Sequence, residues 1–150
     1  SVIKSVVDSN ENRSNLLLNR IYEILNRKIK KKIITFLGVT FKANTDDMRD
    51  SSSLTMIPLL AKKGAIIRYF DPTGPKKEFQ KIKNVSYENT IKKSVERSDL
   101  VIIHTEWNDF KSINFKSLIK GKKFSIYDLR NIYSESKIKA QGFKYYSVGR

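Results

Sequence analysis

The chain has 150 residues, no cysteine and a formal net charge of +15. A hydrophobic content of 39% excludes a disordered chain, and the length suits one domain with a packed core. No apolar run approaches the roughly 18 residues that a membrane span needs. The absence of cysteine excludes disulfides and thiolate chemistry, so we expect a cytoplasmic protein. The chain starts with Ser and enters a helical pattern at once, which we interpret as a piece of a longer protein.

The basic charge raises the question of a nucleic-acid partner. The lysines are spread over loops and helix faces, in runs such as 28–32, 76–77 and 120–123. They do not alternate with aromatic residues, as a groove for single strands would require. We therefore expect no specific nucleic acid, and we keep a basic nucleic-acid-binding α/β domain as an alternative from a different functional class.

Residues 1 to about 29 are predicted to form a long helix. Apolar residues recur there at spacings of three, four and seven, which places them on one face. The polar stretch 9–14 is either an exposed face of this helix or a junction between two helices. The basic run 27–32 is expected to end it. The residues that carry this pattern are Ile3, Val6, Val7, Leu17, Ile21, Ile24 and Leu25.

From residue 33 onwards, short β-type runs alternate with helical segments. Alternating strands and helices indicate βαβ units. We therefore predict an α/β fold: a Rossmann-like, doubly wound, mostly parallel sheet preceded by the long N-terminal helix. The predicted strands are 33–37, 66–70, 84–87, 100–104, 123–127 and 144–148, and the predicted helices are 52–63, 90–97, 114–119 and 134–141.

The loop after the first predicted strand has an unusual composition. It spans 38–51 and reads Gly-Val-Thr-Phe-Lys-Ala-Asn-Thr-Asp-Asp-Met-Arg-Asp-Ser. A dinucleotide-binding loop would contain Gly-x-Gly-x-x-Gly, so that bare backbone could approach a pyrophosphate. This loop has a single glycine, followed by Phe41, Lys42 and Arg49. In this loop, the cationic side chains of Lys42 and Arg49 would take the place of the glycine-rich backbone that binds a pyrophosphate.

Two cations and an aromatic ring are predicted to converge at one edge of the sheet. Phe41 and Lys42 follow the first strand, and Arg130 follows the fifth. In the usual doubly wound order, strands one, four and five are neighbours, so these side chains should face one crevice. Such a set suits a diphosphate joined to a flat base. In the alternative interpretations, Lys42 is a solvated loop residue and Arg130 forms a salt bridge with Asp128 or Glu106.

Other polar residues near this edge favour structural roles. Asp46 and Asp47 are expected to orient Arg49 or to accept loop amide hydrogens, rather than to act as an acid–base pair. Asp71 precedes a proline, and we favour a turn there over contact with a ribose. His104 ends a buried strand and is predicted to be a hydrogen-bonded core residue.

Several segments resemble those of a known family in the same order along the chain. Beyond the loop 38–51, the matches are 63–65, 69–72, 105–107, 128–131 and the ending 142–150. Together they resemble the C-terminal domain of the UDP-glucose/GDP-mannose dehydrogenase family. The resemblance implies that Phe41, Lys42 and Arg130 contact a UDP-sugar. It also implies that Arg49 reaches the phosphates of NAD held by another domain.

The resemblance further implies an oxidoreductase. Family members oxidise the C6 hydroxyl of UDP-glucose in two hydride transfers to NAD, giving UDP-glucuronate. They use a catalytic cysteine in a central region and a glycine-rich N-terminal domain, and this chain has neither. We therefore expect residues 1–30 to be the end of the central helical region and 31–150 the C-terminal UDP-sugar-binding domain.

On this interpretation the fragment alone should bind the nucleotide sugar without turning it over, and no metal is expected. Its expected partners are UDP-glucose, the N-terminal and central domains of the same protein, and further copies of it in a homo-oligomer. Within the family, a UDP-N-acetylhexosamine or GDP-mannose dehydrogenase remains the alternative.

Overall fold

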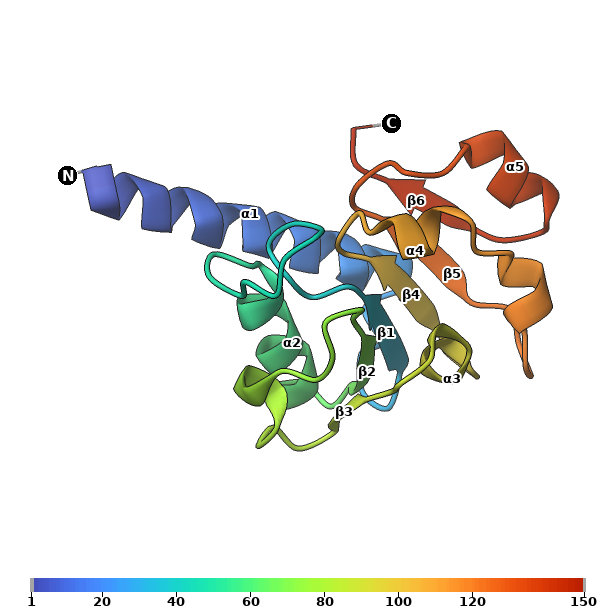
Figure 1. Ribbon diagram of the computed structural model, residues 1–150, viewed down its shortest axis with the longest axis horizontal. Coiled ribbons are helices and arrows are strands. Elements are labelled where there is room, and N and C mark those ends of the chain that lie inside the picture. The colour runs from blue at the N-terminus through green and yellow to red at the C-terminus, as the bar shows by residue number, and fades with distance from the viewer. Residues whose placement is uncertain (1, 150) are drawn as a thin grey trace.

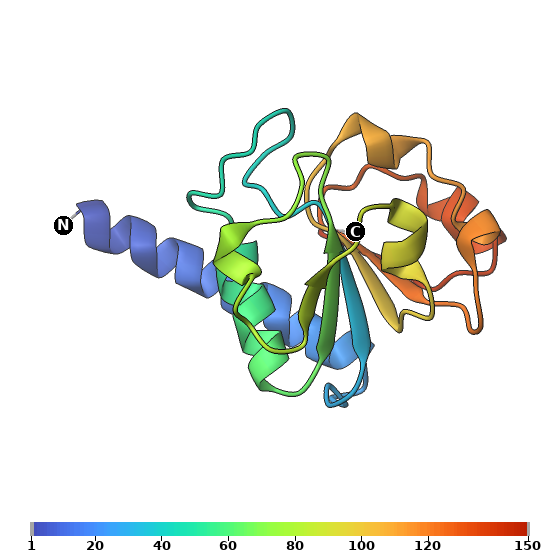
Figure 2. The same ribbon diagram turned by 60° about the horizontal axis from the view of Figure 1, so that its bottom comes forward.

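A computed structural model describes residues 2–149, and the side chains of 12–149. Its six strands form one parallel sheet with helices on both faces (Figures 1 and 2). The elements are α1 (Val2–Ile24), β1 (Ile33–Leu37), α2 (Ser53–Lys62), β2 (Ile66–Phe70), η1 (Lys77–Phe79), β3 (Val85–Tyr87), α3 (Ile91–Val95), β4 (Leu100–Ile103), α4 (Asn108–Lys111), η2 (Phe115–Leu118), β5 (Ser125–Asp128), α5 (Glu135–Ala140) and β6 (Tyr145–Ser147). Within the described part of the chain, no helix is both long and apolar enough to cross a membrane.

The strand order is β3-β2-β1-β4-β5-β6, and every neighbouring pair is parallel. The order reverses between β1 and β4, which lie side by side at the centre of the sheet. The predicted fold class and the predicted adjacency of the first, fourth and fifth strands are therefore confirmed. The carboxyl ends of β1, β4 and β5 meet at one edge, where open α/β sheets bind their ligands.

Two apolar cores lie on opposite faces of the sheet because successive side chains of a strand point in opposite directions. In β4, Leu100 and Ile102 pack with α1 and α2, whereas Val101 and Ile103 pack with α3, α4 and α5. All four side chains are fully buried. This explains why the central strands are almost wholly apolar in sequence.

Helix α1 is continuous through residues 9–14, so the hypothesis of a junction there is wrong. It also ends before the predicted limit. Asn26 adopts a left-handed conformation with φ 53°, and its N–H donates to the carbonyl of Glu23. The N–H of Arg27 donates to the carbonyl of Tyr22, which completes a Schellman-type ending. Ser1, and the side chains of the first eleven residues, lie outside the described part.

Two short elements were not predicted, and one predicted helix is only a single turn. The sequence predicted a helix over 114–119, but η2 is one 3-10 turn. Its Phe115 is fully buried and packs edge-to-face against Phe124, Tyr133 and Phe143. This aromatic anchoring holds the segment in place without a regular helix. The elements that the sequence did not reveal are α4 and η1.

Candidate functional site

The loop after β1 is held tightly against the end of β4. Gly38 has φ +79°, and its N–H donates to the carbonyl of Phe70. A Cβ at this position would lie 2.6 Å from the Cβ of Thr105, so only glycine fits without displacing the neighbouring strand end. The Thr105 hydroxyl donates to the Thr40 carbonyl at 2.9 Å. These contacts fix the path of the loop as it leaves the sheet.

The loop is equally fixed where it returns to α2. The carbonyl of Val39 accepts hydrogen bonds from the hydroxyls of Ser51 and Ser53, both at 2.6 Å. The N–H of Val39 donates to the buried carboxylate of Asp71 at 2.9 Å, and this carboxylate also accepts the N–H of Thr73. Asp71 therefore shapes a turn, as the sequence predicted.

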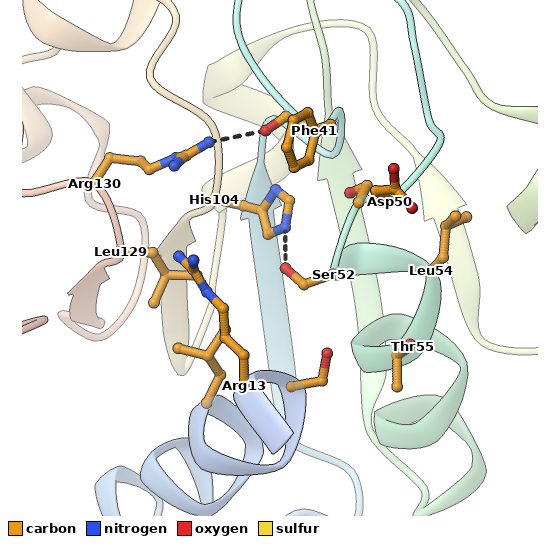
Figure 3. Close-up of a pocket in the computed structure, with 12 residues that line it drawn as sticks. Arg13, Phe41, Asp50, Ser52, Leu54, Thr55, His104, Leu129 and Arg130 are labelled. Atoms are coloured by element: carbon orange, nitrogen blue, oxygen red, sulfur yellow. Dashed lines mark hydrogen bonds between the residues drawn. The ribbon is translucent and has the colours of Figure 1, made fainter. Parts of the chain in front are cut away.

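A cavity of about 520 Å³ opens at this edge, between α1, the loop, the start of α2 and the ends of β4 and β5 (Figure 3). Its position is the one predicted for a ligand site in a doubly wound sheet. The positive end of the α2 dipole also faces it. The residues that line it are Arg13, Ser14, Leu17, Phe41, Asp50, Ser51, Ser52, Leu54, Thr55, His104, Leu129 and Arg130.

Phe41 and Arg130 come together as the sequence predicted. The Arg130 Nη2 donates to the Phe41 carbonyl at 2.9 Å, and half of the Phe41 surface remains exposed. The Arg130 side chain pairs with neither Asp128 nor Glu106, within the described residues. Only its backbone N–H contacts the Asp128 carboxylate, at 3.1 Å. Its Nε is buried without a hydrogen-bond partner in the described part of the chain.

Lys42 and Arg49 are not brought into this cavity. Lys42 is exposed on the loop and is absent from the lining. Arg49 lies in a neighbouring groove, where its Nε and Nη2 each donate to the Asp47 carboxylate at 3.0 Å. These hydrogen bonds lower the pKa of Asp47. The Arg49 side chain nevertheless remains 87% exposed, so it stays accessible from solvent. The predicted orienting role of Asp47 is confirmed.

His104 lies at the centre of the cavity wall and is buried, with two hydrogen-bond partners. Because Thr105 gives its own hydroxyl hydrogen to Thr40, it must accept from the His104 Nδ1, 3.1 Å away. The Nε2 is then an acceptor for the Ser52 hydroxyl at 2.9 Å. The prediction of a hydrogen-bonded core histidine is confirmed, although His104 also contacts the site.

The electrostatics of the cavity keep this imidazole neutral. Burial, together with the positive charges of Arg130 and Arg13, lowers the pKa of His104 to about 3. An imidazole with so low a pKa is a weak base at neutral pH. The cavity is therefore suited to binding an anion rather than to acid–base chemistry through His104.

Arg13 and Ser52 are site residues that the sequence analysis missed. Arg13 lies on α1, one turn before Leu17, whose side chain is in the core. The spacing of four puts both on the helix face that packs against the domain. That signal was present in the sequence, but the periodicity analysis considered only apolar residues. Ser52 precedes the first residue of α2, where a helix-capping role was the ordinary expectation.

We predict that His104 makes the protein sensitive to acid. The unfolded chain binds a proton at His104 near the ordinary pKa of 6.5, whereas the folded chain does so only near 3. Its contribution to stability is thus complete above pH 6.5 and is lost as the pH falls towards 3. Denaturant unfolding would measure the free energy of unfolding of both proteins as the pH is lowered. Between about pH 6 and pH 4, this free energy should fall by up to about 1.4 kcal/mol per pH unit more in wild type than in His104→Gln. Parallel stability curves would contradict a neutral buried His104.

Comparisons with known proteins agree with the fold. Residues 35–135 match the UDP-binding domain of the UDP-glucose/GDP-mannose dehydrogenase family. The UDP-glucose 6-dehydrogenase of Rickettsia felis is 36% identical over 99% of this chain and 34% of its own length. The chain therefore spans about a third of the curated relatives that it matches.

Solved structures give the same result. A UDP-D-ManNAc dehydrogenase from Pyrococcus horikoshii has a TM-score of 0.68 and 29% identity, covering 93% of this chain and 30% of that one. A UDP-glucose dehydrogenase from Pyrobaculum islandicum has a TM-score of 0.73 and 25% identity, covering 96% and 31%. Its order of strands agrees with this match, and the chain belongs to the UDP-glucose/GDP-mannose dehydrogenase family.

Proposed function

We propose that this chain is the UDP-sugar-binding part of an NAD-dependent dehydrogenase that oxidises UDP-glucose to UDP-glucuronate. Residues 31–150 would form the binding domain, and 1–30 the end of a central helical region. The observation that carries the proposal is the pairing of Phe41 with Arg130 at the mouth of the cavity, at the sheet edge where nucleotides bind. The family membership of the chain supports the same interpretation.

Each proposed contact follows from the chemistry of its side chain. The half-exposed ring of Phe41 offers a face for a flat base, and the fork of Arg130 suits phosphate oxygens. Lys42 neighbours Phe41 on the exposed side of the loop, where its flexible stem would reach the phosphates or the sugar from the rim. The N-terminus of α2 adds a favourable dipole for the same anion.

UDP-glucose is the preferred substrate because the curated relatives at 34–36% identity carry the name UDP-glucose 6-dehydrogenase. The neighbour from P. horikoshii, named a UDP-D-ManNAc dehydrogenase, is 29% identical. A UDP-N-acetylhexosamine or GDP-mannose is therefore the alternative substrate. Since this chain covers about a third of its relatives, residues that distinguish the sugars can lie outside it.

NAD would be bound mainly by another part of the protein. The β1–α2 loop has one glycine, and Thr105 packs directly against it, so its backbone does not form a pyrophosphate cradle. The contact that this chain would supply is Arg49, whose exposed guanidinium would exchange Asp47 for a phosphate of the cofactor. NAD would accept the hydride in the reaction. The chain itself would hold and orient the nucleotide sugar.

Replacing Lys42 with alanine should weaken UDP binding by roughly 1.5–3 kcal/mol, the range for a hydrogen bond to a charged group. Lys77→Ala is the matched control, because Lys77 is also exposed but lines the neighbouring groove and does not adjoin Phe41. Isothermal titration calorimetry of both variants with UDP would measure the difference. Equal losses at the two positions would mean that diffuse charge binds the nucleotide, and the site would be wrong.

The 150-residue chain should bind UDP-glucose yet produce no NADH from UDP-glucose and NAD. Hydride transfer needs the nicotinamide within about 3–3.5 Å of the sugar carbon, and this chain lacks a glycine-rich cradle to hold it. The chain also has no cysteine to serve as the nucleophile expected from the family. Absorbance of NADH at high protein concentration would test this. Measurable turnover would overturn the proposed division between this chain and the remaining domains.

In the complete protein, Arg49→Ala should raise the KM for NAD by about tenfold, the effect of losing ~1.4 kcal/mol from a charge-assisted hydrogen bond. The KM for UDP-glucose should change little. Asp47→Asn is an informative control, because it weakens the ion pair that holds Arg49 while it leaves the guanidinium in place. Steady-state kinetics with each substrate varied in turn would decide. A change confined to the KM for UDP-glucose would mean that Arg49 belongs to the substrate site.

A further inference from the structure

Helix α1 supplies a second arginine to the cavity that Arg130 lines. Arg13 rises from α1 at the bottom of the close-up, and Arg130 extends above it to the Phe41 carbonyl (Figure 3). We propose that Arg13 binds the diphosphate of the nucleotide sugar together with Arg130. This inference rests on the proposed function and adds a ligand-binding residue that lies within the helical region before the sheet domain.

The backbone that carries Arg13 is fixed by packing. The next residue, Ser14, is buried and also lines the cavity, and Leu17 and Ile21 follow on the same face in the core shared with α2. The guanidinium itself stays exposed to the cavity side of the helix. A long side chain on a rigid helix turn can therefore be offered to a ligand at little cost in backbone order.

The charges of the two arginines converge on one point. Both Arg13 and Arg130 act on His104, where their positive charges help to lower its pKa. Within the described residues, neither guanidinium forms an ion pair with a carboxylate. The single acidic residue of the lining is Asp50, which is exposed. Two like charges that face one cavity repel each other, and an anion between them would relieve that repulsion.

A diphosphate fits this arrangement better than a single carboxylate would. It carries charge on two linked groups, so that one guanidinium can engage each of them in a forked geometry. The partial positive charge at the N-terminus of α2 would add a favourable field on the same side. Neutral His104 does not oppose the anion and holds the Ser52 hydroxyl in place.

Calorimetric titration of the 150-residue chain with UDP and with uridine would test the proposal. Arg13→Gln should weaken UDP binding about tenfold or more, because it removes a charge-assisted contact. Uridine has no phosphate, so its binding should change less than twofold. Arg20→Gln is the matched control: it lies two turns further along α1, pairs with Glu23 and is absent from the lining. It removes the same charge and should leave UDP affinity within twofold.

The outcomes separate this inference from the proposed function. An Arg13→Gln variant that keeps wild-type UDP affinity, while Lys42→Ala loses it, would refute the role of Arg13 and leave the nucleotide site standing. Equal losses for Arg13→Gln and Arg20→Gln would also overturn it, since long-range charge alone would explain them. If the wild-type chain bound neither UDP nor UDP-glucose, the proposed function would fall together with the inference.

Discussion

The close approach of Gly38 to Thr105 is the constraint on which the site depends. The contact leaves no room for a Cβ, and Thr105 then donates to Thr40, so the β1 loop is held directly against the end of β4. Beyond this attachment the loop presents the Phe41 carbonyl to Arg130. A more open loop would give bare backbone for a pyrophosphate, as in dinucleotide-binding folds. Here Gly38 packs against Thr105 instead, so side chains rather than bare backbone would contact the ligand.

Electrostatics and burial act together in the cavity. A protonated His104 would add a third positive charge beside Arg13 and Arg130, in a place where water cannot screen it. Keeping the imidazole neutral lets it accept the Ser52 hydroxyl and donate to Thr105. The hydrogen-bonded chain thereby ties α2 to the end of β4 without using charge. The two guanidinium groups remain available for a ligand, whereas Arg49 is engaged with Asp47 outside the cavity.

Sequence patterns predicted the strands because buried parallel strands leave continuous apolar runs between glycines and prolines. The usual doubly wound order predicted which of them are neighbours at the ligand-binding edge. Adjacency of β1, β4 and β5 then placed Phe41 and Arg130 together correctly. The pattern could not show that Lys42 lies outside the lining, because that depends on the turn of an irregular loop. It also missed Arg13, since contact between α1 and the sheet edge comes from tertiary packing. The end of α1 was set by Asn26, a local signal that the basic run after it obscured.

Arg13 changes how the two parts of the chain relate to each other. If α1 were only a connector, its inner face would need apolar packing and nothing more, which Leu17 and Ile21 already provide. An arginine one turn before Leu17 on that face, beside the same cavity as Arg130, brings the helix into the binding site. A nucleotide held between them would link α1 to the end of β5 by ionic contacts. Ligand binding would then stabilise the position of the helix against the sheet, since whatever binds the assembled pair favours it over the separated one.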